Sequence, residues 1–245
     1  MYLWVMFQEL DKISEVARYL WEKGWAEYNG GNISVNLTEQ LQETFKEKGA
    51  ISGRIEIASE LKMLAGELFY VTGTGKRMRD VARSPWENGA IIRICDDGRG
   101  YELIYKDNIP PTSELISHLY MHHCLRQMGR DTKVVLHTHP TELIALTHIK
   151  RWLDSEALTQ MLWSMIPECR MVVTKGVGVV PYISPGTVEL AEATVVELEK
   201  HDVIIWEKHG VLAVGDDIST CFDTIDTLNK SAQIYIHAKA AGFQN

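Results

Sequence analysis

Three histidines stand first among the residues whose types and spacing could do chemistry. His137 and His139 are separated by one residue in "VLHTHP", directly after an apolar run. Side chains at positions i and i+2 of a strand point to the same side, so this pair can place two imidazoles on one face. A catalytic zinc ion takes three protein ligands and keeps one position open. The pair therefore predicts a metal site that needs a third ligand from another segment.

His209 is the predicted third ligand. It lies in "EKHG", a tight turn between two apolar runs, and Gly210 allows the backbone to bend there. An isolated histidine is more often an ordinary core or surface residue than a ligand. An H-x-H pair at a strand end, with a turn histidine downstream, favours a metal site.

A second set with metal-ligand spacing consists of Glu114, His118 and His122, which step by four along one predicted helix. His118 and His122 follow the same stripe as Leu115 and Leu119, which favours a place at the edge of the core. Glu114 differs because it lies at the helix start, next to a loop. There a carboxylate can serve as a fourth ligand or as a general base.

Two glycine-rich turns form the other chemical signal: "NGGN" (residues 29–32) and "TGTG" (residues 72–75). Both allow close backbone approach to a ligand and offer donors of the kind that hold a phosphate. Neither is a nucleotide-binding fingerprint, so an ordinary tight turn is an equal alternative for each. Ser113, at a helix start, would complete such an anion pocket. The basic run that begins at Lys76 is typical of a solvated face, although it would raise the local potential for a phosphate.

The elements that must position these groups alternate between strand and helix patterns. Helices are predicted around residues 13–21, 112–128, 187–200 and from a cap at Asp216 or Asp217 onward, with Thr112 or Ser113 as the cap of the second. Strands are predicted at "ISVNL", which alternates like a half-buried strand, and at "ELFYV", "AIIRI", "YELIY", "KVVLHTH", "CRMVV", "VGVVPY", "DVIIW" and "GVLAVG". The least patterned stretch is 38–68, where we expect an insertion or a long loop.

Several of these strand pairs are linked by hairpins. This favours an α/β (α+β) fold with a mostly antiparallel central sheet and helices packed on it, in a single domain over residues 1–245. A chain of 245 residues with 45% hydrophobic residues can bury a sizeable core without disulfide or metal staples.

Charge and cysteine usage narrow the partners and the compartment. The formal net charge of −8 argues against nucleic acid as a partner. The four cysteines are scattered, which predicts reduced thiols in a cytoplasmic protein. The apolar N-terminus "MYLWVMF" is too short to span a membrane and has no positive run before it, so no membrane association is expected.

Together the motifs resemble a known family. "KGWAEYNGGNISV", "VTGTGK", "PPTSEL", "HTHPTELIALT" and "KHGVLAVG" occur in this order, and the likeness runs from about Leu20 to Gly242. The set resembles the zinc-dependent class II sugar-phosphate aldolases. That family includes aldolases for L-rhamnulose and L-fuculose phosphates, ribulose-5-phosphate 4-epimerase and the non-catalytic adducin head domain. The stretch from Trp163 to Cys169 and the "KGW-E-NGGN" pattern look most like the L-rhamnulose 1-phosphate member.

The resemblance implies a set of site residues. It implies one zinc ion per subunit on His137, His139 and His209, with Glu114 as the acid/base. Glu168, in "IPEC", would be a second catalytic carboxylate near the aldehyde end of the substrate. The phosphate-binding residues that it implies are Asn29, Gly31, Asn32, Thr74, Gly75 and Ser113. It also implies a cyclic homotetramer with sites near subunit interfaces.

The expected reaction is zinc-dependent cleavage of L-rhamnulose 1-phosphate to dihydroxyacetone phosphate and L-lactaldehyde, a step of rhamnose catabolism. An L-fuculose-phosphate aldolase or a ribulose-5-phosphate 4-epimerase would share the metal chemistry and remains an alternative. An adducin-like scaffold is more remote, because it has no reason to keep three histidines and an acid/base in place. An unrelated zinc hydrolase would share the histidines but need no phosphate pocket.

Overall fold

The computed structural model describes residues 2–45, 50–105 and 109–244. Its strands are β1 (Asn32–Asn36), β2 (Ile55–Glu56), β3 (Leu68–Thr72), β4 (Gly89–Ile94), β5 (Gly100–Tyr105), β6 (Val134–Thr138), β7 (Gly178–Val180), β8 (Val203–Trp206) and β9 (Gly210–Gly215). They form one sheet in the order β2-β5-β4-β3-β1-β6-β9-β8-β7. Neighbours pair antiparallel except β7 and β8, which are parallel. The mostly antiparallel sheet predicted from the hairpins is confirmed.

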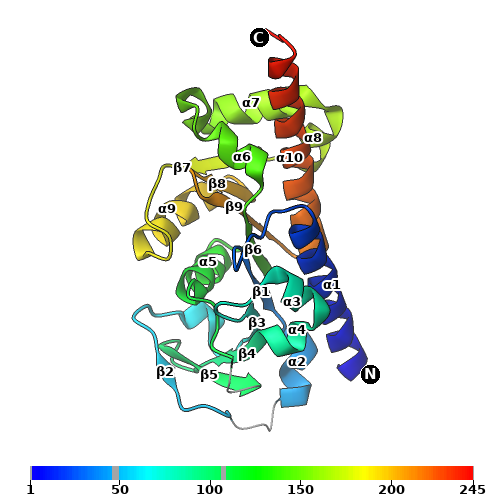
Figure 1. Cartoon of the computed structure of the whole chain (residues 1–245). Helices are drawn as coiled ribbons and strands as arrows, with labels where there is room; N and C mark the ends of the chain where they lie inside the picture. Colours follow the sequence, from blue (N-terminus) through cyan, green and yellow to red (C-terminus); the bar gives the residue numbers. More distant parts are fainter. Residues whose placement is uncertain (1, 46–49, 106–108, 245) are drawn as a thin grey trace.

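The helices lie on both faces of this sheet. They are α1 (Tyr2–Glu22), α2 (Thr38–Phe45), α3 (Met78–Arg83), α4 (Pro85–Asn88), α5 (Leu115–Gln127), α6 (Thr141–Leu146), α7 (Ser155–Met165), α8 (Pro167–Val172), α9 (Val188–Leu198) and α10 (Ile218–Ala240), with 3-10 turns at Lys62–Leu64 and Lys150–Leu153. In Figure 1, α1 and α10 lie on one side of the strands, and α5 and α9 lie on the other. No helix among the described residues combines the length and apolar character needed to cross a bilayer.

Helices on both faces require strands that are apolar on both faces. In β6, Val134 and Leu136 belong to the core that includes residues of α1 and α10. Val135 points the other way, into a core shared with α5 and α9. The period-2 alternation of the strand thus feeds two cores instead of one core and solvent.

The strand β1 departs from its prediction. The alternation in "ISVNL" predicts a strand with one solvated face, but all five residues of β1 are buried. Its polar side chains Asn32 and Ser34 face α5, where they hydrogen-bond to His118. His118 and His122 are themselves 0% and 3% exposed, so they lie inside the core, not at its edge. A polar face of a strand can therefore be buried when another element supplies its hydrogen-bond partners.

Two helix starts show how local chemistry set the boundaries. Asp217, one of the two predicted caps, accepts hydrogen bonds from the backbone N–H groups of Ser219 and Thr220 at the start of α10. The predicted cap of α5 is wrong: the helix starts after Glu114, without a side-chain cap. Thr112 instead accepts from the backbone N–H of Glu114 in the preceding turn.

The segment "CRMVV" is also wrong as a strand, because it lies in the short helix α8. Pro167 occupies its first turn, a position where the missing N–H has no cost and the fixed φ suits a helix. A short apolar run cannot be assigned to helix or strand by periodicity alone. The poorly patterned 38–68 stretch contains α2, β2 and a 3-10 turn, while residues 46–49 lie outside the described part of the chain.

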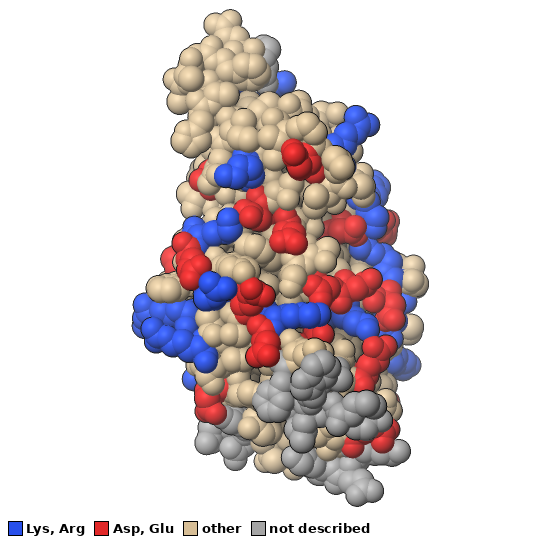
Figure 2. All heavy atoms as spheres, turned by 90° about the vertical axis from the view of Figure 1, so that its right-hand side faces the viewer, with Lys and Arg blue, Asp and Glu red and all other residues tan. Residues whose placement is uncertain are grey.

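The helices α1 and α10 are joined by ion pairs across their contact. Lys12 lies 2.6 Å from Asp217, and Lys23 lies 2.8 Å from Asp226. Figure 2 shows acidic and basic side chains interleaved over this face. These partly exposed pairs contribute at most about 1 kcal/mol each, so apolar packing dominates the docking of the helices. The four cysteines are free.

Burial of neutral histidines makes stability depend on pH. Desolvation lowers the pKa of His118 and of His122 to about 3, against about 6.5 in an unfolded chain. The stabilisation is therefore complete above pH 6.5 and is lost as pH falls from 6.5 toward 3, where the unfolded chain binds more protons. Each histidine adds a slope of up to about 1.4 kcal/mol per pH unit. Urea unfolding at pH 7.5, 6.0 and 5.0 should show this loss, and the slope should be smaller in His122→Gln.

Candidate active site

The predicted site residues converge on one pocket of about 300 Å³. Those that line it are Asn29, Gly31, Asn32, Thr74, Gly75, Ser113, Glu114, His137, His139 and His209. They come from the turn before β1, the turn after β3, the start of α5, the end of β6 and the β8–β9 turn. Sheet pairing brings two of these segments together, since Asn32 of β1 is the register partner of His137 in β6. Glu168 is the only predicted site residue that does not line this pocket.

Three different backbone settings hold the histidines. His137 lies near the end of β6 and pairs with Leu212 of β9. His139 lies just beyond the strand, and its backbone N–H donates to the carbonyl of Trp25 at 2.9 Å. His209 lies in the β8–β9 turn. One ring-nitrogen ligand atom from each of the three histidines can be chosen so that all lie within 4.8 Å of one another.

Hydrogen bonds fix which ring nitrogens face inward. The Nδ1 of His137 lies 3.1 Å from the carbonyl oxygen of Val211, and the Nδ1 of His139 lies 2.7 Å from Oε1 of Glu27. Carbonyl and carboxylate oxygens only accept, so both Nδ1 atoms carry the proton and donate it. Both Nε2 atoms are then bare lone pairs, although they lie only 3.2 Å apart.

Two bare nitrogens at this distance repel unless a cation lies between them. A tetrahedral zinc with Zn–N bonds of about 2.0–2.1 Å places two ligand nitrogens about 3.3 Å apart. In addition, Nδ1 of His209 is buried without a hydrogen-bond partner. The residues present therefore fit a divalent metal held by three imidazoles, each oriented as in known metal sites by a second hydrogen bond or by packing.

The electrostatics keep His137 and His209 neutral and ready to bind a cation. Burial lowers the pKa of His137 well below its usual range, and the nearby His139 and His209 lower it further. Burial and His139 also lower the pKa of His209 to about 4. Neutral imidazole is the form that ligates metals, so at neutral pH neither ring has to lose a proton first.

The absence of a side chain at Gly210 allows the β8–β9 turn to lie close to the rings of His137 and His139. A Cβ atom at this position would lie 2.7 Å from Cε1 of His137, 2.9 Å from Cδ2 of His139 and 2.6 Å from the carbonyl oxygen of Thr138. The contact with the backbone cannot be relieved by a side-chain rotation. The turn can therefore approach the two rings only because residue 210 has no side chain.

Gly210→Ala is expected to weaken the binding of a divalent metal such as Zn²⁺ by about 10- to 100-fold, the cost typical of disturbing the support of metal ligands. Competition with a chromogenic chelator would measure the affinity. Gly53→Ala is the matched control, because a Cβ there meets nothing within 4 Å. Wild-type affinity in Gly210→Ala would show that the rings do not have to meet at this spacing.

Glu114 faces the metal cluster from the start of α5. Desolvation raises the pKa of its carboxyl group, while a hydrogen bond from the side chain of Asn32 and the proximity of His139 oppose that rise. A partly buried carboxylate with a raised pKa is suited to exchange a proton near neutral pH. Its position beside, and not within, the histidine triangle suits a proton-transfer role.

The other end of the pocket is built from backbone and small polar groups. Gly31 and Gly75 adopt positive φ angles of 75° and 67°, which glycine reaches without steric cost. Thr74 and Ser113 are exposed toward this end, and Lys76 adds a positive charge to the lining. This combination of flexible turns, hydroxyls and one cation suits an anionic group such as a phosphate.

Two predictions about carboxylates had different outcomes. The structure places Glu168 in the first turn of α8, exposed and away from the pocket of the same chain, so its catalytic role stays a prediction. Glu27 was not predicted, yet it orients His139. It is the glutamate of the "KGW-E-NGGN" pattern, but nothing local indicates a partner 112 residues away.

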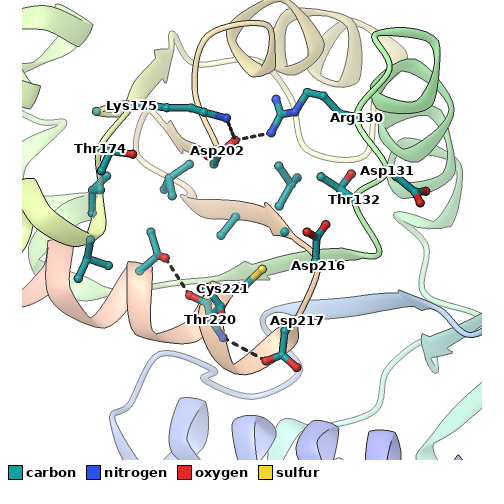
Figure 3. Close-up of a pocket in the computed structure, with 18 residues that line it drawn as sticks. Arg130, Asp131, Thr132, Thr174, Lys175, Asp202, Asp216, Asp217, Thr220 and Cys221 are labelled. Carbon is teal, nitrogen blue, oxygen red and sulfur yellow. Dashed lines mark hydrogen bonds and ion pairs between the residues drawn. The ribbon is translucent and has the colours of Figure 1, made fainter.

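A larger cavity of about 510 Å³ lies elsewhere, between the α5–β6 connection, the start of α10 and residues 172–176 (Figure 3). Three of its charged groups are engaged with one another: Arg130 and Lys175 both donate to Asp202. Asp217 caps α10 and pairs with Lys12. Size alone therefore does not mark the site, and the smaller pocket carries the chemistry.

Comparison with known proteins agrees with this geometry. Residues 11–236 match the family described as Class II Aldolase and Adducin N-terminal domain, and the chain belongs to that family. It is 51% identical over 237 residues to a rhamnulose-1-phosphate aldolase of Bacteroides thetaiotaomicron, and the aligned region covers 97% of this chain and 88% of that protein. A rhamnulose-1-phosphate aldolase of Escherichia coli is 36% identical over 228 residues, covering 91% and 82%.

Solved structures show the same fold. A sugar-phosphate aldolase from Thermotoga maritima superimposes with a TM-score of 0.84 at 30% identity, covering 98% of both chains. An L-fuculose 1-phosphate aldolase superimposes with a TM-score of 0.62 at 22% identity, covering 96% of this chain and 88% of the other. The latter likeness concerns the fold alone. The family and fold predicted from the motifs are confirmed.

Proposed function

We propose that this chain is an aldehyde-lyase that cleaves L-rhamnulose 1-phosphate to dihydroxyacetone phosphate and L-lactaldehyde with a zinc ion as cofactor. The observation that carries the proposal is one pocket that joins three convergent imidazoles, a partly buried carboxylate and two glycine-rich turns. The 51% identity to a rhamnulose-1-phosphate aldolase supports the choice of substrate. The reaction would serve rhamnose catabolism in the cytoplasm.

The phosphate end would fix the substrate. The backbone N–H groups of the turns at Gly31 and Gly75, with the hydroxyls of Thr74 and Ser113, would donate to phosphate oxygens. The side chains of Asn29 and Asn32, which also line the pocket, would add amide donors. Holding the remote phosphate converts the encounter into an oriented, effectively unimolecular reaction.

The metal end would carry the bond cleavage. His137, His139 and His209 would hold zinc, which supplies Lewis-acid stabilisation of the negative charge that develops as the C3–C4 bond breaks. Glu114 would take the proton from the C4 hydroxyl and later return a proton to the carbon that gained the electron pair. Burial raises the pKa of Glu114, which makes its carboxylate a stronger base for the hydroxyl proton.

Glu168 and the assembly belong together in this proposal. Glu168 is exposed on α8, so a role near the aldehyde end requires a second copy of the chain to carry it to the pocket. The homotetramer with sites near subunit interfaces, implied by the family resemblance, would meet that requirement. One domain spanning residues 1–245 would be the subunit.

A coupled assay tests the proposal. The zinc-loaded protein should release dihydroxyacetone phosphate from L-rhamnulose 1-phosphate, followed through an NADH-dependent reductase, and a chelator should stop the release. L-fuculose 1-phosphate and ribulose 5-phosphate are run beside it. Cleavage of the fuculose ester alone, or epimerisation of ribulose 5-phosphate alone, would replace the proposed substrate while keeping the site. No turnover of the three substrates by zinc-loaded protein would contradict the enzymatic proposal.

A further inference from the structure

A continuous chain of buried hydrogen bonds leads away from the pocket into the core. Asn32, at its mouth, hydrogen-bonds through Oδ1 to Nε2 of His118. The Nδ1 of His118 lies 2.8 Å from Oγ of Ser34, and that oxygen lies 2.9 Å from Nε2 of His122. These four residues are between 0% and 7% exposed. At the pocket end, the side chain of Asn32 hydrogen-bonds to Glu114.

The sequence periods explain why these residues meet. Asn32 and Ser34 are two apart on β1, so they point to the same face of the sheet. His118 and His122 are four apart on α5 and therefore share the side of that helix that covers β1. This interlocking arrangement also explains the two histidines at metal-ligand spacing, which are engaged with β1 instead of an ion.

Each inner member of the chain has one proton to donate and one position to accept. Burial keeps both imidazoles neutral, so each ring has one N–H group and one bare nitrogen. All the bonds must then run in one direction. If His122 donates from Nε2 to Ser34, then Ser34 donates to His118, and His118 donates to the carbonyl oxygen of Asn32. The amide N–H₂ group of Asn32 is left to face the pocket.

If the hydrogen bonds ran in the opposite direction, the amide group of Asn32 would be reversed. The backbone of Thr132 also hydrogen-bonds the ring of His122, and a proton held there would leave Nε2 of His122 as an acceptor. Every bond would then reverse, and Asn32 would turn its carbonyl oxygen toward Glu114. In this direction the amide oxygen of Asn32 faces the ionised carboxylate of Glu114, whereas in the first direction a bare nitrogen of His122 faces the Thr132 backbone. The loss at the charged group is the larger of the two, which favours the first direction.

We propose that Ser34, His118 and His122 are positioning residues for the amide of Asn32. They keep its N–H₂ group directed at Glu114 and at the phosphate end of the pocket. The inference rests on the proposed phosphate pocket and adds to it the part of the core that determines the donor orientation. A buried chain of this kind is suited to this task because its hydrogen bonds must all run in the same direction.

Ser34→Ala is the main test, since it removes one fully buried hydroxyl and interrupts the chain. The readout is the affinity for inorganic phosphate, measured by titration calorimetry on zinc-loaded and on chelator-treated protein, together with kcat and KM on L-rhamnulose 1-phosphate. We expect phosphate affinity and kcat each to fall about tenfold, as when a hydrogen bond to a charged group is lost. The control is Ser231→Ala, which removes another 0% exposed hydroxyl, in α10, and should bind phosphate like the wild type.

A second pair of variants separates hydrogen bonding from packing. His122 packs against Phe69 with the two rings tilted and their centroids 5.0 Å apart, and it does not line the pocket. His122→Leu keeps an apolar side chain but cannot bond to Ser34, whereas His122→Gln can still present an amide at the place of Nε2. We expect the leucine variant to repeat the loss of phosphate affinity and the glutamine variant to restore most of it. Ring ¹⁵N spectra of the wild type should show the proton on Nε2 in both His118 and His122.

The outcomes divide clearly. Unchanged phosphate affinity in Ser34→Ala and His122→Leu would overturn the inference, as would equal losses in His122→Leu and His122→Gln, or a proton on Nδ1 of either ring. No phosphate binding by the wild type would also overturn it. If the expected phosphate pattern holds while L-rhamnulose 1-phosphate is not cleaved, the positioning chain stands and the proposed substrate fails.

Discussion

Replacing His139 by alanine is expected to lower kcat/KM for L-rhamnulose 1-phosphate by about 10³-fold or more and to reduce bound zinc to a small fraction of one ion per subunit. Lewis-acid stabilisation is worth several kcal/mol in the transition state, and each 1.4 kcal/mol is a factor of ten in rate. His139 is one of two residues whose Nε2 atoms lie 3.2 Å apart, so its loss leaves the metal with two protein ligands. Metal content by mass spectrometry and the coupled assay measure the two effects.

His139 makes a cleaner test than His137 because its side chain is 16% exposed and its loss removes little core packing. The unfolding free energy of His139→Ala should therefore stay close to that of the metal-free wild type, since bound metal itself stabilises the folded state. His237→Ala, an exposed histidine on α10, is the matched control and should keep both zinc and activity. An active, zinc-loaded His139→Ala protein would contradict the three-histidine site.

The metal cluster could be predicted because its signals are local. The H-x-H pair follows from the two-residue period of a strand, and the turn histidine is marked by the glycine beside it. Glu114 could be predicted for a similar reason, because the sequence shows that it lies at a helix start next to a loop. Local pattern predicts the hairpin of β8 and β9. It does not predict the antiparallel pairing of β6 with β9, which brings the two histidine signals together, because that pairing joins distant segments.

What the sequence concealed depends on partners far along the chain. Glu27 orients His139 across 112 residues, and Ser34 meets His118 across 84. The polar side chains of β1 therefore predicted a solvent-exposed face. In the structure the imidazoles of α5 cover that face and supply its hydrogen-bond partners. The error at α8 is of another kind: the five residues of "CRMVV", four of them apolar, fit both helix and strand, and Pro167 together with packing on α7 and α10 decided the outcome.

Glu114→Gln is expected to lower kcat by about 10³-fold while leaving zinc content and phosphate affinity near wild-type values. General acid–base catalysis contributes roughly 10²- to 10⁴-fold, and glutamine keeps the shape of glutamate but cannot exchange a proton. Glu114 does not belong to the group of side chains that could hold the metal, so its replacement should leave the metal site intact. This separation of chemistry from binding distinguishes Glu114 from His139.

The matched control for this variant is Glu189→Gln, which changes an exposed carboxylate in the first turn of α9. It should retain full activity. Loss of zinc together with activity in Glu114→Gln would assign the carboxylate to the metal shell instead of to proton transfer. Retention of wild-type kcat would move the acid/base role to another group, with Glu168 from a second copy as the next carboxylate to test. Glu114→Asp keeps the acid but shortens its reach. If the position of the carboxyl group matters as much as its raised pKa, this variant should recover only part of kcat.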